Sequence, residues 1–205
     1  MKKIIPLLGI LAFFATNSCK KKDLTYQIKG TIYDSSFNSP LAGAQVVISA
    51  SSSGSALSTL TTLTTDASGN YSYELKRDKY QSITIAVTKS NYFSDGSTTT
   101  LDNLSLEDDN AFNYNMYARS WVRLHFVSDG TKVIKYYKQG GKNGCAECCP
   151  TGEIQLNNIT DQSVYCINDG NTPYKIFYDV QGTTNNGTLE VITAPFDTTE
   201  LLISY

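Results

Sequence analysis

Apolar and polar residues alternate with a period of two along much of the chain, a pattern that predicts β-strands. In residues 26–34 the alternation starts at Tyr26 and places Ile28 and Ile32 on one face. The same pattern predicts strands at residues 45–50, 59–65, 71–75, 83–87 and 112–117. Long stretches rich in alanine or leucine are absent after residue 18. The sequence therefore predicts an all-β fold.

Polar segments separate these strands and have the composition of turns and loops. Residues 35–40 and the serine-rich residues 51–58 are predicted to be loops, whereas residues 66–70 are typical of a tight hairpin turn. Gly69 falls where such a hairpin requires positive φ, and Gly43 follows a proline-containing turn where the chain enters a strand. Both glycines therefore have backbone reasons for their identity, and neither needs a ligand.

The alternation resumes after residue 120 and predicts a second group of strands. These strands are expected at residues 121–127, 132–137, 154–156, 162–167, 174–180, 188–193 and 201–205. Asp-Gly, Asn-Gly and Gly-Gly turns separate them, a spacing that suggests a second small β-sandwich of immunoglobulin-like type. With a short hinge near residues 118–120, the expected domains are residues 26–117 and 118–205, packed end to end.

The first eighteen residues follow a different pattern. A basic start, Lys2 and Lys3, precedes an apolar run of twelve residues at positions 4–15. A membrane-crossing helix needs about 20 apolar residues, so residues 1–18 are predicted to be a cleaved secretory signal peptide. The mature chain is therefore expected outside the cytoplasm.

Cys19 follows this segment directly, after Ser18 and before three lysines. This context resembles the lipobox of bacterial lipoproteins, and in particular lipoproteins of the Bacteroidetes group. The resemblance implies that Cys19 is acylated and becomes the mature N-terminus, with residues 19–25 as a lipid-anchored linker. It also implies an outer-membrane lipoprotein of the cell envelope, facing either the periplasm or the outside. The alternative is an ordinary signal peptide in which Cys19 carries no lipid.

Three sequence blocks between residues 26 and 117 resemble the carboxypeptidase regulatory-like domain family. They are Gly-Thr-Ile-Tyr-Asp at 30–34, Pro-Leu-Ala-Gly-Ala-Gln-Val at 40–46 and Thr-Asp-Ala-Ser-Gly-Asn-Tyr at 65–71. The resemblance implies a transthyretin-like β-sandwich with no zinc site or catalytic residue of its own. One departure is Asn91, which stands where the family usually has glycine.

Four cysteines remain once Cys19 is set aside, and an even number in an exported domain favours disulfides. A bond between Cys148 and Cys149 is disfavoured, because neighbouring Cα atoms lie about 3.8 Å apart and disulfides prefer about 4.4–6.8 Å. Two pairings stay open: Cys145 with Cys148 and Cys149 with Cys166, or Cys145 with Cys149 and Cys148 with Cys166. Either pairing would attach the glycine-rich loop at residues 140–152 to the strand that carries Cys166.

Two other roles for these cysteines are open at this point. Cys145 and Cys148 have the spacing of a zinc knuckle, but the other two cysteines do not repeat it, and an oxidising compartment disfavours thiolate ligands. A redox-active pair would need a helix N-terminus to lower the thiol pKa, and the sequence predicts no such helix. We therefore expect two disulfides, no metal and no cofactor.

Candidate catalytic residues are few. The single histidine, His125, lies on a strand with Val122, Leu124 and Phe126 on the opposite face, so it is predicted to be a surface or interdomain residue. The three acids at 107–109 are expected in a solvated turn, with calcium binding as the alternative. No motif of a catalytic triad or a phosphate loop accompanies them.

The net charge of the chain also limits the classes of partner that we expect. Removing residues 1–18 takes away Lys2 and Lys3 and no acid, which lowers the formal net charge from -2 to about -4. The only basic run, residues 20–22, lies beside Cys19 and is read as a spacer near lipid headgroups, so nucleic acid is not an expected partner. The sequence favours a non-enzymatic binding or scaffold module with a protein or glycan partner. The alternatives are a glycan-binding accessory protein that uses exposed tyrosines and Trp121, and a hydrolytic enzyme.

Overall fold

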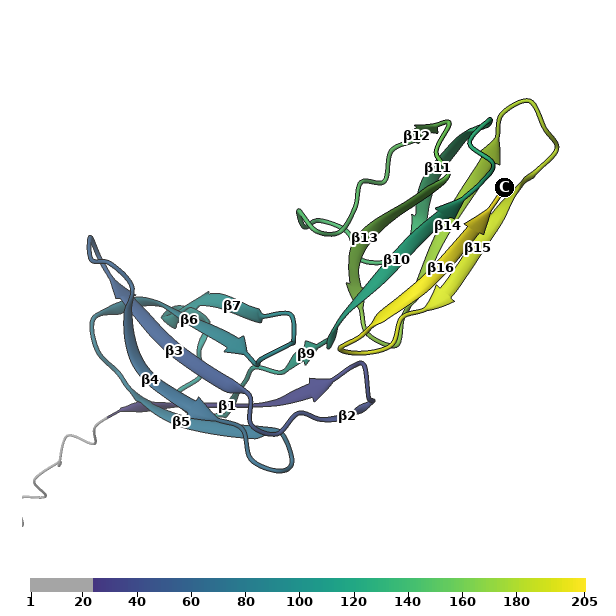
Figure 1. The fold of residues 1–205 in the computed structure, drawn as a ribbon. Coiled ribbons are helices and arrows are strands. Elements are labelled where there is room, and N and C mark those ends of the chain that lie inside the picture. Colours follow the sequence, from purple (N-terminus) through teal and green to yellow (C-terminus); the bar gives the residue numbers. More distant parts are fainter. Residues whose placement is uncertain (1–23) are drawn as a thin grey trace, which may run out of the picture.

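The computed structural model describes residues 24–205, which form two β-sandwiches (Figure 1). The predicted all-β fold with two small sandwiches is confirmed. Cys19 and the predicted signal peptide lie outside the described residues. In residues 24–205, no helix is both long enough and apolar enough to cross a membrane.

The first sandwich is built from nine strands and one short 3-10 turn. These elements are β1 (Thr25–Asp34), β2 (Ser39–Pro40), β3 (Gln45–Ser52), β4 (Ser58–Thr64), β5 (Asn70–Lys76), β6 (Tyr80–Thr88), β7 (Asp95–Thr100), η1 (Leu101–Asn103), β8 (Asn110–Ala111) and β9 (Tyr114–Met116). One sheet has the order β4-β3-β6-β7, and the other has β1 at its centre, between β2 and β5, with β8 and β9 also paired to it. The antiparallel pairs of β1 with β5 and of β3 with β6 form the largest part of the two sheets.

The core of the first sandwich lies between these two sheets and follows from the alternation in each strand. On β1, Ile28 and Ile32 are fully buried, as the sequence pattern predicts. Ile48 on β3 and Ile85 on β6, which lie opposite each other, face them from the second sheet. Every second residue is therefore removed from water, which is the main stabilisation available to such a fold.

Two turn residues behave as their chemistry requires. Gly69 has φ 74°, and a side chain there would bring Cβ to 2.4 Å from the carbonyl oxygen of Ile32. Both the positive φ and the lack of room for a Cβ therefore require glycine here, as predicted. Asn91 has φ 63°. Asparagine is one of the few non-glycine residues that adopt this left-handed conformation readily, so the backbone at this position does not require glycine.

Three expectations for the first sandwich need correction. Residues 35–40 are not all loop, because β2 pairs Ser39 and Pro40 with the end of β1. β7 was not predicted, since its sequence DGSTTT has no apolar alternation. Of the strand expected at 112–117, only Tyr114–Met116 forms β9, whereas β8 (Asn110–Ala111) lies before it; both are parallel to β1. The chain leaves the sheet between them, where the Asn113 side chain accepts a hydrogen bond from the backbone N–H of Thr31.

The second sandwich contains seven strands in two sheets. They are β10 (Arg119–Val127), β11 (Val133–Gly140), β12 (Ile154–Asn157), β13 (Asp161–Asp169), β14 (Pro173–Val180), β15 (Asn186–Ile192) and β16 (Thr198–Ser204). The sheet orders are β13-β10-β16 and β12-β11-β14-β15. All seven predicted strands occur within a few residues of their expected ends. On β10, Val122, Leu124 and Phe126 are buried on one face, as predicted.

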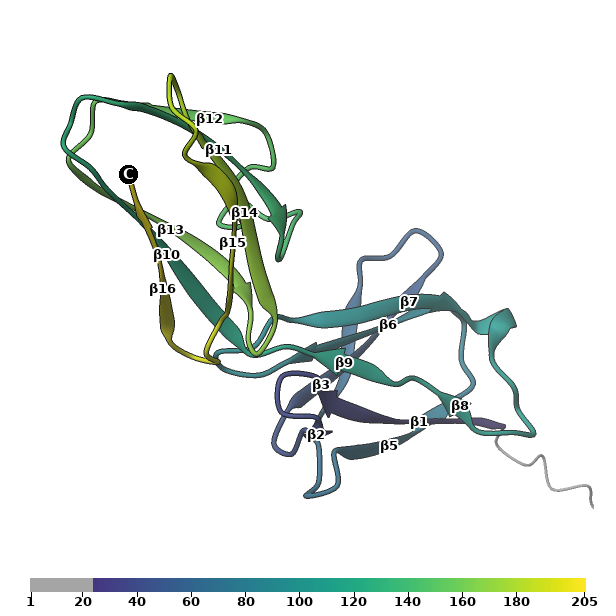
Figure 2. The same ribbon diagram turned by 90° about the vertical axis from the view of Figure 1, so that its right-hand side faces the viewer.

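The two sandwiches lie end to end, and the chain passes from β9 into β10 through only two residues, Tyr117 and Ala118 (Figures 1 and 2). Leu24, the first described residue, lies at the end of the first sandwich that is farthest from the second, where the grey trace begins. The described molecule is therefore elongated, with the second sandwich as the end distal to the N-terminus.

Candidate functional site

The four predicted cysteines form two disulfides in the second sandwich. Cys145 is bonded to Cys148, and Cys149 is bonded to Cys166 on β13, with Cα–Cα distances of 5.1 and 5.3 Å. The first of the two open pairings is therefore the one present. All four sulfur atoms are used in these bonds, so none is left as a thiolate ligand for zinc. The loop at residues 140–152 is attached to β13 as expected.

The side chain of a buried lysine, which is not among the predicted site residues, also binds this loop through hydrogen bonds. Lys138 on β11 is 6% exposed, and its Nζ donates to the carbonyl oxygens of Lys142, Cys148 and Cys149 at 2.7, 2.5 and 3.0 Å. Burial lowers the pKa of the Lys138 ammonium. Three acceptors match the three N–H donors of an ammonium group, so the group is well satisfied despite its burial. The sequence could have indicated its burial, because Lys138 continues the every-second-residue pattern of the inward-facing Ile134 and Tyr136.

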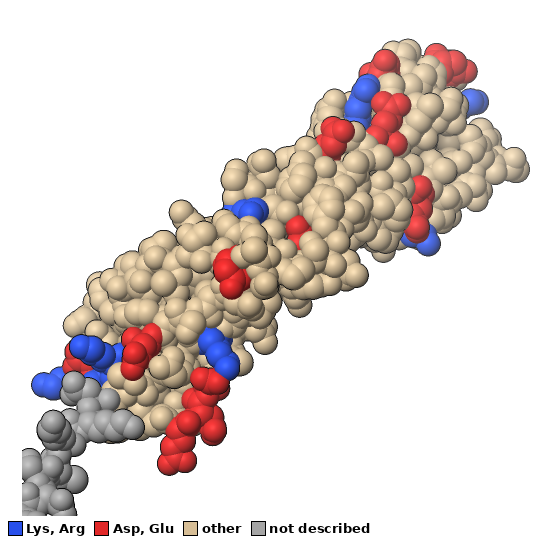
Figure 3. All heavy atoms as spheres, turned by 90° about the horizontal axis from the view of Figure 1, so that it is seen from below, with Lys and Arg blue, Asp and Glu red and all other residues tan. Residues whose placement is uncertain are grey.

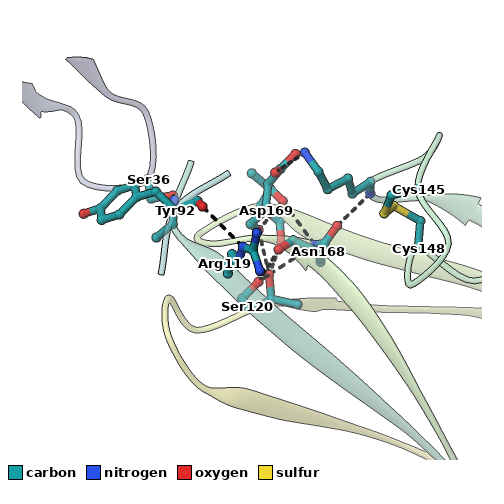
Figure 4. A network of polar contacts seen from close by, with 12 residues as sticks. Ser36, Tyr92, Arg119, Ser120, Cys145, Cys148, Asn168 and Asp169 are labelled. Atoms are coloured by element: carbon teal, nitrogen blue, oxygen red, sulfur yellow. Dashed lines mark hydrogen bonds and ion pairs between the residues drawn. A yellow bond between two sulfur atoms is a disulfide. The ribbon is translucent and has the colours of Figure 1, made fainter. Parts of the chain in front are cut away.

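The loop is also connected to a polar network at the base of the second sandwich (Figure 4). Asn168 is fully buried, and its side-chain oxygen accepts from the backbone N–H of Lys142 at 2.7 Å. Ser120 donates to the carbonyl oxygen of Asn168, and Lys142 forms an ion pair of 2.7 Å with Asp169. Every one of these groups has a partner, which makes the network a structural element rather than a set of free reactive groups.

This network continues across the junction between the two sandwiches. The backbone N–H of Gly170 donates to the carbonyl of Ala118 at 2.8 Å, and the Asn171 side chain donates to the carbonyl of Ser36 at 2.6 Å. Arg119 donates through Nε to the carbonyl of Tyr92 at 3.2 Å, as Figure 4 shows. Residues far apart in the sequence therefore bind the two sandwiches to each other at several points.

Aromatic side chains complete the junction. The ring of Phe196, from the second sandwich, stacks on Phe37 at 5.9 Å between centroids and meets the edge of Tyr92 at 5.4 Å. Tyr92 donates to the buried carboxylate of Asp34 at 2.6 Å, and burial together with this hydrogen bond raises the pKa of Tyr92. The Lys142 ammonium lies 3.8 Å from the centroid of the Phe93 ring. Phe196 itself has φ 64°, a conformation rare for a bulky residue.

His125 lies on the outer face of the sheet that contains β10, as predicted, but neighbouring side chains largely cover it. Its side chain is 16% exposed, with Nε2 2.9 Å from Asp161 and Nδ1 3.4 Å from Glu200. Ser163 lies opposite His125 on β13, yet its hydroxyl accepts from Arg123 at 2.8 Å. Within residues 24–205, no hydrogen bond joins this serine to the histidine, and the buried Nδ1 of His125 has no hydrogen-bond partner, so the cluster lacks the geometry of a serine nucleophile with its base.

The acids at 107–109 lie in an exposed turn, as predicted. Asp109 forms an ion pair with Lys29 on β1, and Asp108 accepts a weak hydrogen bond from Ser105. Among the described residues, no group of three or more histidine, cysteine, aspartate or glutamate side chains has the arrangement of a metal site.

A groove of about 570 Å³ crosses the outer surface of the first sandwich beside β1 and β5. Its polar groups are largely engaged with one another. Asn70 accepts from the Thr31 hydroxyl at 2.9 Å, and the Tyr71 hydroxyl donates to the carbonyl of Phe112 at 2.8 Å. Asp66 accepts from the backbone of Asn70 at 2.8 Å. This groove offers few unengaged groups to a ligand.

The second hollow of interest lies on the second sandwich. It has a volume of about 310 Å³ and is lined by Lys135, Tyr137, Glu153, Phe177, Asp179 and Asn186. These residues come from β11, β14 and β15 and from the segment just before β12. Unlike the groove of the first sandwich, it contains an aromatic pair, in which Tyr137 is exposed and Phe177 is partly buried.

Comparison with known proteins gives little further information. No protein-family model matches the chain, and no curated protein matches it. The resemblance of residues 26–117 to carboxypeptidase regulatory-like domains therefore stays a prediction.

Among solved structures, the chain is similar to the shaft pilin SpaA from Lactobacillus rhamnosus GG, with 11% identity over 88% of this chain and 97% of that one and a TM-score of 0.37. A streptococcal ancillary pilin has 10% identity over 90% of this chain and 63% of that one, with a TM-score of 0.38. The Bacillus anthracis TIE protein has 14% identity over 88% of this chain and 34% of that one, with a TM-score of 0.35. At these scores the likenesses carry no conclusion about family or function.

Proposed function

We propose that this protein is a non-enzymatic binding or scaffold module, exported and tethered to the cell envelope through a lipid on Cys19. The observation that carries the proposal is the end-to-end arrangement of two sandwiches bound together at the junction (Figure 1). A tether at the N-terminus would hold the first sandwich near the membrane and project the second away from it. Rigid sandwiches of this kind commonly present partners with an exposed face or loop.

The candidate reactive groups support a role without catalysis. The four described cysteines are bonded in pairs, His125 is hydrogen-bonded to Asp161, and the Ser163 hydroxyl is engaged by Arg123. Acidic and basic side chains are interspersed on the face seen in Figure 3, which gives no extended basic field of the kind that attracts nucleic acid. Protein and saccharide partners fit such a surface better.

The proposal is tested by expressing the full chain in a Gram-negative host and comparing it with Cys19→Ser. We expect palmitate incorporation and membrane fractionation for the parent chain and the loss of both for the variant. Protease accessibility on intact cells, followed by cross-linking and pull-down of the tagged chain, then identifies the exposed leaflet and the partner. A parent chain that carries no lipid and is recovered in the soluble fraction would refute the tether, and turnover of a bound partner would refute the non-enzymatic role.

A glycan-binding accessory role is the second candidate, and the aromatic pair on the second sandwich favours it. Trp121, which together with exposed tyrosines suggested this role in the sequence, is only partly exposed on the other sheet. The stronger aromatic surface comes from Tyr137 and Phe177, which are 40 positions apart in the sequence and meet only in the folded sheet.

A further inference from the structure

An aromatic pair marks the outer face of the sheet β12-β11-β14-β15. Tyr137 on β11 and Phe177 on β14 lie directly opposite each other, with ring centroids 5.4 Å apart and planes inclined by 32°. Their neighbours Tyr136 and Ile176 point into the core and are buried. Since side chains alternate along a strand, the two rings must face outward, and Tyr137 is 37% exposed. We call Tyr137, Phe177 and the hollow beside them the aromatic platform.

Cross-strand aromatic pairs also stabilise sheets without binding anything. The residues around this pair distinguish a binding surface from a purely structural pair. The hollow next to the rings is about 310 Å³, at the lower end of the range of small-ligand sites, and its other walls are polar side chains. Lys135 and Asp179 lie opposite each other on β11 and β14 and contribute a donor and an acceptor beside the rings, so apolar and hydrogen-bonding surfaces converge on one space.

Two ion pairs lie around the platform, and the Asp179 carboxylate, which accepts from the Gln181 side chain, is in neither of them. Lys135 lies 2.9 Å from Glu153, and Lys175, next to Phe177 on the same face, lies 3.8 Å from Glu190. The charged residues that line the hollow, Lys135, Glu153 and Asp179, sum to one negative charge, so an anionic ligand would be repelled. A flat protein partner would have to desolvate both ion pairs, which is costly for partly exposed charges. A neutral ligand with hydroxyl groups can hydrogen-bond to these side chains while leaving the pairs intact.

We infer that the aromatic platform binds a neutral oligosaccharide. A pyranose ring offers an apolar C–H face that can lie on Tyr137 and Phe177, and hydroxyl groups that both donate and accept at its edge. Lys135 and Glu153 on one side and Asp179 and Asn186 on the other supply the complementary donors and acceptors. The inference rests on the proposed role as a non-enzymatic binding module and names the class of its ligand. The platform lies on the sandwich distal to the N-terminus, where a ligand can reach it.

The test uses the whole chain from residue 19 and a set of neutral probes: cellohexaose, maltohexaose, xylohexaose and mannohexaose. Titration is followed by calorimetry and by backbone amide NMR shifts. We expect saturable binding of at least one probe at millimolar concentration, with shifts centred on β11 and β14. Tyr137→Ala should weaken binding by about tenfold or more, as for a central aromatic contact. Phe177→Leu keeps an apolar side chain and should weaken it as well, provided that its circular dichroism spectrum matches that of the parent.

Tyr165→Ala is the matched control. Tyr165 is 59% exposed on β13, in the opposite sheet, and its removal should leave binding unchanged. Hexagalacturonate, an acidic probe, should bind more weakly than the neutral probes. Absence of saturable binding to every neutral probe, equal weakening by Tyr165→Ala, or preference for the acidic probe would each overturn the inference while leaving the tethered scaffold intact. Cleavage of a bound hexaose would instead refute the non-enzymatic role and leave the platform in place.

Discussion

The two sandwiches reach a stable fold by different means. Eighteen buried apolar side chains form the core of the first sandwich, against eleven in the second. Among the described residues, the first sandwich has no disulfide, whereas the second has two, together with the buried ammonium of Lys138. Because hydrophobic stabilisation scales with the apolar area removed from water, the smaller core contributes less. The second sandwich thus combines a smaller apolar core with covalent cross-links, which the described part of the first sandwich lacks.

The largest expected effect comes from removing the disulfide between Cys149 and Cys166. The double variant Cys149→Ala/Cys166→Ala should lower the free energy of unfolding of the second sandwich by about 3 kcal/mol, because the unfolded chain regains the entropy of that loop. The only tryptophan, Trp121, lies on β10 and reports on this sandwich by fluorescence during guanidinium unfolding.

The second disulfide provides the matched comparison. Cys145→Ala/Cys148→Ala opens a shorter loop and should cost about 2 kcal/mol. Hydrogen exchange of the first sandwich should change with neither variant. Equal loss of protection in β3 and β6 would contradict the view that only the second sandwich depends on cross-links.

The next largest effect concerns the packing of the first sandwich around Gly30. A Cβ at Gly30 would lie 1.8 Å from the carbonyl oxygen of Phe112 and 2.9 Å from the Tyr71 ring. Gly30→Ala should therefore push residues 110–113 away from β1 and destabilise the first sandwich by about 2 kcal/mol. Amide exchange at β8 and β9 should accelerate, whereas the midpoint of Trp121 fluorescence stays constant.

Gly152→Ala is the control, since a Cβ there meets nothing within 4 Å and the residue does not have positive φ. It should leave both sandwiches unchanged. If Gly30→Ala shifted the tryptophan transition as much as it accelerated exchange in β8, the two sandwiches would unfold as one unit, and the comparison between them would fail.

The sequence was sufficient to predict a strand and its buried face where the alternation lies within that one strand. In residues 26–34 and 121–127, apolar residues on every second position predicted both the strand and its buried face. β7 was missed because its residues are almost all polar, and its place in the sheet depends on backbone hydrogen bonds to β6. Inward alternation identified buried positions on β11 as well, but the lysine at 138 gave no indication of the carbonyl groups that satisfy it.

Features that combine distant residues lay beyond the sequence. The spacing of four cysteines left two pairings open, because Cys148 and Cys149 are neighbours and either could reach Cys166. The aromatic platform depends on the register between β11 and β14, which places Tyr137 opposite Phe177. That register is set by the whole sheet rather than by either segment. The sequence alone therefore suggests exposed tyrosines and Trp121 as sugar-binding aromatics, without singling out Tyr137 or pairing it with Phe177.

The smallest expected effect on stability concerns the junction, where the two sandwiches meet. Phe196→Ala removes the ring that contacts both Phe37 and Tyr92, and each sandwich should lose less than about 1 kcal/mol because both cores stay intact. The orientation of the sandwiches should nevertheless loosen. Spin labels at Ser55→Cys and Thr184→Cys, exposed positions on opposite sandwiches, should give a narrow distance distribution in the parent and a broad one in the variant.

Phe196→Gly separates contact from backbone strain at the same position. Glycine tolerates φ 64° without cost, whereas alanine does not, so the glycine variant should be the more stable of the two while its distance distribution is equally broad. Phe37→Ala removes the same stacking from the first sandwich and should add little to the loosening in the double variant. A distribution that stays narrow in all three variants would mean that the polar contacts of Arg119 and Asn171 alone fix the junction. The two sandwiches would then be joined by specific polar links rather than by apolar contact.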